Sequence, residues 1–252
     1  MFLALAFGIS WAAYGLSSFF EWSDAVGEAL DLTVKFGPSL GGLIAALVLS
    51  GRTGAIDLLR RLFRGSPAWL LLALLLPIVV IQVALAIRAV VGGAMGPVAM
   101  GVGEATLVFL SLLATRFFLG GGLGEELGWR GIMLPALQRH MSPLRASVWV
   151  GVAWGLWHLP AYGAAIVVFV PFSIALSVVF TLFYNRTGGS LLVVALLHAS
   201  VNASLSAMEE ILPALDDELL VQLLALLVWG VMGAWVARRM TAVSSVAPAE
   251  GV

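Results

Sequence analysis

The chain has 252 residues, of which 61% are hydrophobic and only 11% are charged. Soluble domains are about half apolar and about a quarter charged, so this composition excludes a water-soluble globular protein. The formal net charge is -1, and no basic patch with interleaved aromatic residues is present, so no nucleic-acid partner is expected. The chain contains no cysteine, which excludes disulfides, thiolate metal sites and a cysteine nucleophile.

Apolar stretches of membrane-spanning length recur along the whole chain. Each crossing needs about 20 apolar residues, and the pattern predicts eight spans, at 2–20, 36–50, 68–91, 104–119, 145–160, 161–184, 188–206 and 219–237. The first begins without a basic segment before it, so we predict a transmembrane helix and not a cleaved signal. The Gly120-Gly121-Gly122 run should end the fourth span, with a tilted or partly re-entrant helix following at 123–138. The predicted fold is therefore an all-α, polytopic transmembrane helix bundle.

The spans divide the chain into four parts. Residues 1–103 form the N-terminal helices, 104–206 a core, 207–240 a C-terminal helix, and 241–252 a tail that we expect to be disordered. If the N-terminus is cytoplasmic, every lysine and arginine except Lys35 and Arg88 lies on or near the cytoplasmic side. This bias is what the positive-inside rule expects. We therefore predict that both termini are cytoplasmic and that the protein resides in a bacterial inner membrane.

One group of charged residues stands between the fourth and fifth spans. Ionisable side chains inside a membrane cost roughly 2.5–3.5 kcal/mol on insertion scales, which makes them functional candidates. Glu126 and Arg130 are four residues apart, so they share a helix face and can pair. Glu125 is turned by about 100° from Glu126 and can point elsewhere. The alternative is an ordinary solvated helix start, where acidic side chains are favoured by the helix dipole.

Further polar side chains stand in the later spans. His158 ends the fifth span beside two tryptophans, and the plain interpretation is a core histidine next to an interfacial tryptophan belt. His198 and Asn202 lie at i, i+4 in the seventh span, where they could simply form interhelical hydrogen bonds worth about 0.6–2 kcal/mol. Arg116 should reach the cytoplasmic interface at the end of the fourth span, and we assign it no role.

Considered together, these residues favour catalysis. Glu125, His158, His198 and Asn202 come from three helices. They would supply a carboxylate base, an imidazole partner and hydrogen-bond donors for an oxyanion, which is a water-activating site.

Three motifs carry a family resemblance. Glu125-Glu126-x-x-x-Arg130, Trp154-x-x-x-His158 and His198-x-x-x-Asn202 resemble, in this order, the motifs of the CPBP family, also called Abi. That family contains the CAAX prenyl endopeptidases and proteins of bacteriocin processing or self-immunity. The resemblance covers about residues 104–205. Its second motif usually begins with phenylalanine, where this chain has tryptophan.

The resemblance implies an intramembrane endopeptidase. Glu125 would activate water with the help of His158, while His198 and Asn202 would stabilise the oxyanion. Glu126 and Arg130 would orient the site. The implied substrate is a peptide or a lipidated protein that meets the enzyme in membrane lipid, and we expect the site to open toward the cytoplasm.

A metal site and several other functions compete with this interpretation. Glu125, His158 and His198 could bind zinc, but the HExxH spacing is absent, so we expect no cofactor. A serine protease is not favoured, because Gly188-Gly189-Ser190 lacks the Gly-x-Ser-x-Gly pattern. Asp216 and Asp217 are expected in an outer loop and form no intramembrane aspartate pair. Two alternatives remain open: a non-catalytic immunity protein or chaperone of the same fold, and a small transporter with a proton relay through the glutamate and the histidines.

Overall fold

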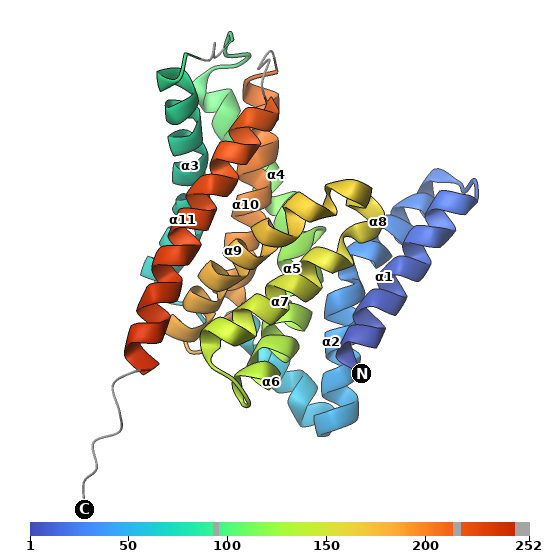
Figure 1. The fold of residues 1–252 in the computed structure, drawn as a ribbon. Coiled ribbons are helices and arrows are strands. Elements are labelled where there is room, and N and C mark those ends of the chain that lie inside the picture. Colours follow the sequence, from blue (N-terminus) through green and yellow to red (C-terminus); the bar gives the residue numbers. More distant parts are fainter. Residues whose placement is uncertain (93–95, 214–217, 245–252) are drawn as a thin grey trace, which may run out of the picture.

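The computed structural model describes residues 1–92, 96–213 and 218–244. All regular structure within these residues is helical, which confirms the predicted all-α class. The elements are α1 (Phe2–Phe19), α2 (Asp24–Arg60), η1 (Arg61–Phe63), α3 (Pro67–Val90), α4 (Val102–Phe118), α5 (Gly121–Gly128), the π-helix η2 (Trp129–Met133), α6 (Leu134–Gln138), α7 (Pro143–Trp157), α8 (Leu159–Tyr162), η3 (Gly163–Ala165), α9 (Ile166–Arg186), α10 (Leu191–Ile211) and α11 (Glu218–Ser244) (Figure 1).

Seven stretches among the described residues are long and apolar enough to cross a membrane, which indicates an integral membrane protein. One of them combines α4 with α5, η2 and α6 into a single interrupted pass. Helix α7, with 15 residues, is shorter than these stretches but packs along α9. With α7 included, the described residues make eight passes through the bundle, in agreement with the eight predicted spans.

The largest difference from the predicted spans is in α2. The sequence predicts a short helix at 36–50, whereas α2 begins at Asp24 and continues to Arg60. Charged residues in its first turns lower the local hydropathy, yet they suit an exposed helix end, where Lys35 pairs with Asp31. Gly51, at φ 63°, interrupts the helix, because this left-handed conformation is readily open only to glycine.

The glycine run between α4 and α5 interrupts the helix as predicted. Helix α4 ends at Phe118 and α5 begins at Gly121. The glycines of this segment also permit close packing, since a Cβ on Gly128 would lie 2.2 Å from the carbonyl oxygen of Pro38 in α2. Small residues commonly let helix backbones approach one another in membranes. The segment 121–138 is thereby held inside the bundle and not on its surface.

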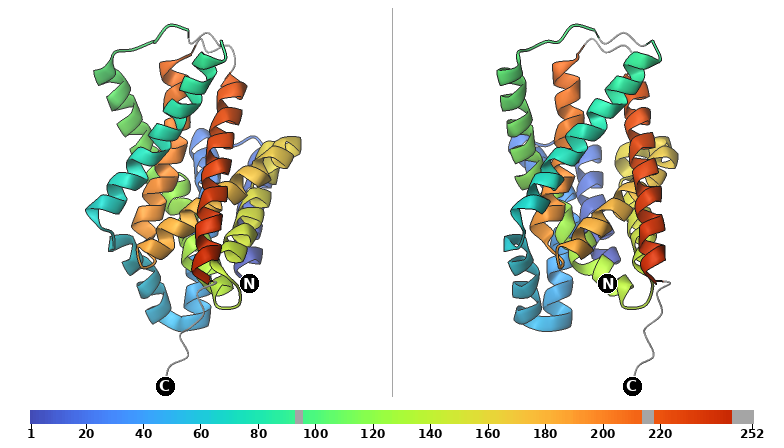
Figure 2. Two further views of the ribbon diagram at one scale, coloured as in Figure 1. Left: turned by 60° about the vertical axis from the view of Figure 1, so that its left-hand side comes forward. Right: turned by 90° about the vertical axis from the view of Figure 1, so that its left-hand side faces the viewer.

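The helices are arranged in two groups around a central layer (Figures 1 and 2). Helices α1 and α2 pair on one side, and α3, α4, α10 and α11 lie on the other. Helices α5, α7 and α9 lie between these groups, and α10 packs on α3, α4, α5 and α9. The sequence motifs are carried by α5 with η2, by the end of α7 and by α10, so they meet at the centre of the bundle.

Helix α11 extends beyond its predicted end. It continues to Ser244, four residues into the segment predicted as a tail. Residues 245–252 of that segment, and the acidic pair Asp216 and Asp217, lie outside the described residues.

Candidate active site

A buried ion pair stands at the centre of the site. Arg130 Nη1 donates a hydrogen bond of 2.8 Å to Glu126 Oε1, and both side chains are 0% exposed. The guanidinium carbon also lies 4.7 and 4.6 Å from the ring centroids of Trp154 and Phe180. Such contacts stabilise a desolvated cation. The predicted pairing across one helical turn is confirmed, and it ties α5 and η2 to α7 and α9.

His198 binds the same carboxylate from α10. Its Nδ1 lies 2.7 Å from Glu126 Oε1. An ionised carboxylate only accepts hydrogen bonds, so Nδ1 carries the proton and donates it. The other ring nitrogen, Nε2, lies 4.0 Å from Glu125 Oε1. The first and third sequence motifs are thus joined through one histidine, whose ring packs edge-on against Trp154 and Phe180.

Glu125 points away from this ion pair, as the helical spacing predicts. Its carboxylate is held by Trp154, whose indole Nε1 donates to Oε2 at 2.5 Å. Only 5% of Glu125 is exposed, yet it lines a cavity. The backbone changes to a π-helix four residues later, where the N–H of Trp129 meets the carbonyls of both Glu125 and Glu126. Such π-helical turns are frequent at functional sites.

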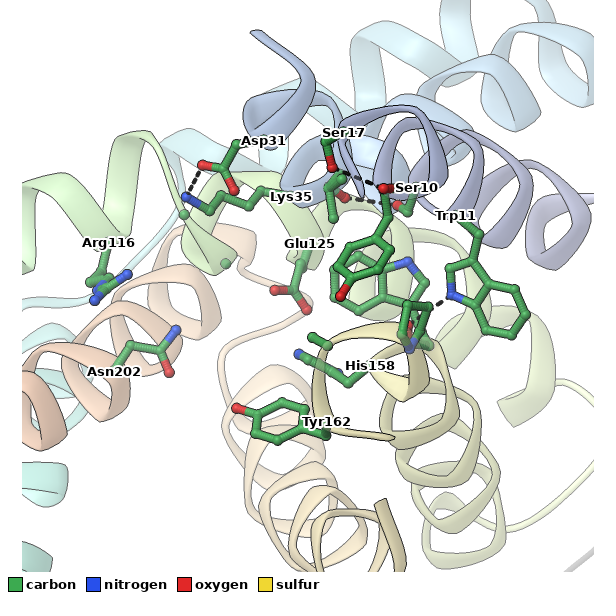
Figure 3. Close-up of a pocket in the computed structure, with 17 residues that line it drawn as sticks. Ser10, Trp11, Ser17, Asp31, Lys35, Arg116, Glu125, His158, Tyr162 and Asn202 are labelled. Carbon is green, nitrogen blue, oxygen red and sulfur yellow. Dashed lines mark hydrogen bonds and ion pairs between the residues drawn. The ribbon is translucent and has the colours of Figure 1, made fainter. Parts of the chain in front are cut away.

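The cavity beside Glu125 has a volume of about 410 Å³. In Figure 3 the polar ends of Glu125, His158, Tyr162, Arg116 and Asn202 face one common space. It is lined by residues of α1, α2, α4, α5, α7, α8 and α10: Ser10, Trp11, Tyr14, Ser17, Asp31, Val34, Lys35, Arg116, Gly120, Gly121, Glu125, Trp157, His158, Pro160, Ala161, Tyr162 and Asn202. Three of the four predicted catalytic residues line the cavity, and the fourth, His198, lies behind Glu125.

His158 occupies the end of α7, where the chain turns into α8. Its Nδ1 lies 2.9 Å from the carbonyl oxygen of Trp154. A carbonyl only accepts, so in the neutral ring Nδ1 donates and Nε2 keeps its lone pair. The rings of Trp157, Tyr162 and Phe169 surround the imidazole, with centroid distances of 4.7, 5.7 and 4.6 Å. The histidine is therefore held in one orientation beside the cavity.

The placement of Arg116 corrects the sequence prediction. Instead of reaching a cytoplasmic interface, Arg116 lines the cavity, and its Nη2 donates to Ser206 Oγ at 3.0 Å. The physical reason is that α4 ends inside the bundle, because the chain continues directly into α5. No carboxylate among the described residues 1–92, 96–213 and 218–244 lies within ion-pair distance of the Arg116 guanidinium.

Gly121 is a site residue whose role the sequence did not reveal. A Cβ at this position would lie 2.3 Å from His198 Nε2 and 2.9 Å from Glu125 Oε1. No side chain fits there without moving one of these groups. The glycine run predicted only an interrupted helix, whereas this glycine also leaves room for the histidine beside the carboxylate. Tyr162 and Lys35 were likewise missed, because nothing in their local sequence relates them to the motifs.

The histidines do not join an evident metal-ligand set. Among the described residues, no three histidine, aspartate or glutamate side chains are grouped so that they could hold a metal ion. The Nδ1 atoms of His158 and His198 are both engaged in hydrogen bonds. The expectation of a metal-independent site remains a prediction.

The cavity lies nearer one end of the bundle than the other, which bears on the predicted orientation of the site in the membrane. Tyr14 and Ser17 line it from the half of α1 farther from Met1, and Asp31 and Lys35 from the first turns of α2. The cavity therefore lies toward the face opposite Met1. The side of the membrane on which this face lies, and the cytoplasmic position of both termini, stay predictions.

Comparison with known proteins agrees with the motifs. Residues 106–204 match the family model described as type II CAAX prenyl endopeptidase Rce1-like. A stretch of 54 residues is 44% identical to CAAX prenyl protease 2 of Methanococcus maripaludis. The alignment covers 21% of this chain and spans only 17% of that relative's length. The matched range of the family model contains Glu125, His158, His198 and Asn202. The resemblance predicted from the motifs is thereby confirmed over residues 106–204, which are similar to the type II CAAX prenyl endopeptidase Rce1-like family.

Proposed function

We propose that this protein is an intramembrane endopeptidase that uses Glu125 to activate water. The observation that carries the proposal is the environment of this carboxylate. It is 5% exposed among apolar helices, yet it borders a cavity together with His158 and Asn202. A carboxyl group in such a place is costly and is a functional candidate by default. The match to CAAX prenyl endopeptidases names the reaction class that these groups would serve.

The chemistry can be written with the groups at the cavity. A water beside Glu125 gives a proton to the carboxylate while its oxygen attacks the carbonyl carbon of the substrate. His158 Nε2, with its lone pair, assists by orienting this water. The electron pair of the carbonyl bond moves to oxygen, and the side-chain amide of Asn202 donates to the oxyanion. His198 Nε2 adds a second donor when its ring is doubly protonated. Glu125 then returns the proton to the amine nitrogen as the carbon–nitrogen bond breaks.

The buried ion pair has a positioning role in this scheme. Glu126 and Arg130 hold His198 and the π-helical turn, and Trp154 holds Glu125. Arranged donors that need no reorganisation during the reaction are the usual source of oxyanion stabilisation. We extend the proposal to a metal-independent reaction, to a peptide or lipidated protein as substrate, and to the bacterial inner membrane as the location.

The test compares Glu125→Gln with a matched control, Glu104→Gln. Glutamine keeps the shape of Glu125 but cannot accept the proton, so cleavage should fall by about 10²–10⁴-fold. Glu104 is exposed at the start of α4, and its variant should cleave at the wild-type rate. The measurement is hydrolysis of a farnesylated peptide by purified protein in detergent, followed by mass spectrometry. Fragments from cells that produce each variant provide a second, substrate-independent comparison.

Two outcomes count against the proposal. Undiminished cleavage by Glu125→Gln would remove the glutamate from the reaction. Absence of any Glu125-dependent fragment, together with an immunity or transport phenotype that the variant retains, would favour the non-catalytic alternatives.

A further inference from the structure

We infer that the cavity opens on the extracytoplasmic face of the membrane, so that the substrate is a polypeptide segment exposed on that face. This inference deepens the proposed function, on which its substrate part rests. It follows from three observations: the position of the cavity in the bundle, the packed side chains between the cavity and the face that holds Met1, and the unequal number of arginines on the two faces.

Successive helices run in opposite directions, so the connections between them lie alternately at the two ends of the bundle, here called the terminal face and the cavity face. The terminal face holds Met1, η1, the α6–α7 and α9–α10 connections and the C-terminal end of α11 (Figures 1 and 2). The cavity face holds the α1–α2 connection and α8, together with the C-terminal end of α3 and the first turn of α4. Both sets alternate along the sequence as expected for eight passes.

The cavity lies toward the cavity face. Its wall includes the last half of α1, the first turns of α2 and α8. Large aromatic side chains end α1 beside it, with Phe19 83%, Phe20 59% and Trp22 46% exposed. Exposed aromatic residues at a helix end are typical of a membrane–water interface. The cavity therefore opens near an interface and not in the middle of the lipid.

The route from the cavity to the terminal face is filled by protein. Trp129 is 0% exposed, and its ring packs edge-on against Phe2 at 5.4 Å and against Trp157 at 6.3 Å. Beside these rings the backbones of α2 and α5 meet at Pro38 and Gly128. Trp11 Nε1 donates to the carbonyl oxygen of Trp157 at 2.9 Å, which attaches α1 to the end of α7. These contacts obstruct entry from the terminal face, which leaves the cavity face as the proposed entrance for water and substrate.

The charges differ sharply between the two faces. On or near the cavity face the described cationic residues are Lys35, paired with Asp31, Arg88, which is 1% exposed, and Arg116, which lines the cavity. The arginines on or near the terminal face are Arg52, Arg60, Arg61, Arg64, Arg139, Arg145, Arg186, Arg238 and Arg239. Orientation in the membrane follows the lysine and arginine residues within about 15–20 residues of the span ends. The terminal face is therefore cytoplasmic, and the cavity face is not.

This orientation replaces the expectation of a site open to the cytoplasm and narrows the substrate class. Segments that remain in the cytoplasm, including the C-termini of cytoplasmic proteins, cannot reach Glu125. The substrates that fit are exported polypeptides and the outer segments of membrane proteins. The acidic residues Glu21, Asp24 and Glu28 lie at the α1–α2 connection on the same face. They would favour substrates that carry basic residues in the segment flanking the cleaved bond on this side of the membrane.

The absence of cysteine permits a direct test by single-cysteine labelling. Ser23 and Ser66 are exposed residues that precede α2 and α3, and neither side chain makes a capping hydrogen bond. They mark the cavity face and the terminal face, while Ser17 marks the cavity itself. A membrane-impermeant maleimide applied to cells with a permeable outer barrier should label Ser23→Cys and Ser17→Cys. Ser66→Cys should react only after the inner membrane is permeabilised.

The reverse pattern, or equal labelling of both faces, would overturn the inference. A second measurement does not depend on these substitutions: green fluorescent protein fused to the C-terminus should fluoresce, because it folds in the cytoplasm, and a dark but intact fusion would contradict the orientation. Labelling needs no catalysis, so this test stands apart from the proposed function. If cleavage is confirmed, fragments that depend on Glu125 should map to exported segments, and fragments from cytoplasmic segments would refute the substrate class.

Discussion

Helices α10 and α4 pack against each other and are both apolar, yet they meet different surroundings. In α10, 72% of the most apolar stretch is buried, whereas α4 has no buried residue. The buried residues of α10 include His198 and several small residues, among them Ala195, Ala199, Ala203 and Ser200, as well as larger ones such as Leu197 and Met208. Both helices are hydrophobic enough for a membrane, and the small residues of α10 help it to approach its neighbours closely within the protein.

The largest effect is expected where this packed region holds charge. Glu126→Ala leaves the fully buried Arg130 without its carboxylate and should destabilise the fold by about 3–5 kcal/mol. Unfolding by denaturant in detergent micelles measures the loss. Glu104→Ala, on exposed α4, should stay within about 0.5 kcal/mol of the wild type. Equal free energies of unfolding for the two variants would show that the buried ion pair does not stabilise the fold.

A methyl group beside the carboxylate should affect activity more than stability. In Gly121→Ala the new Cβ pushes His198 or Glu125 from its position, and displacements of about 1 Å can cost 10²-fold in rate. The matched control is Gly103→Ala in α4, where no atom lies within 4 Å of a Cβ. Peptide hydrolysis at saturating substrate should separate the two variants. Full activity of Gly121→Ala would mean that the site is less closely packed than the distances indicate.

The contrast in packing itself can be tested with one substitution on each helix. Ala203→Leu adds bulk to a fully buried position of α10 and should cost about 1–3 kcal/mol. Ala114→Leu places the same side chain on an exposed position of α4 and should change the unfolding free energy little. The same unfolding assay reads both. Similar values would contradict the division into protein-facing and lipid-facing helices.

The last substitution removes a single hydrogen bond to the Glu125 carboxylate. Trp154→Phe removes the N–H that reaches Glu125 while keeping an aromatic ring near Arg130. One hydrogen bond to a charged group contributes about 1.5–3 kcal/mol, so the rate should fall by roughly 10–150-fold. Peptide hydrolysis at saturating substrate measures the loss, and an undiminished rate would assign the indole a purely structural role.

Contacts within one helix were predictable, and contacts between distant helices were not. The spacing of Glu126 and Arg130 was sufficient to predict their ion pair, and Glu125 was correctly expected to face elsewhere. The cavity wall contributed by α1 and α2 lies about a hundred residues from the motifs, and the bond between Trp11 and Trp157 spans 146 positions. No periodicity encodes such pairings. The course of α2 was underestimated for a different reason, since its charged first turns lower the hydropathy on which span prediction depends.

The π-helix at Trp129–Met133 makes the site depend on a number of residues as well as on their identity. A π-helical turn holds one residue more than an α-helical turn. Deleting a single residue from this stretch would restore a regular helix, and the preceding residues would rotate by about 100° relative to those that follow. Glu125 would then leave its position against the indole of Trp154 although no active-site side chain had been altered. The number of residues in this segment therefore determines the geometry of the candidate site.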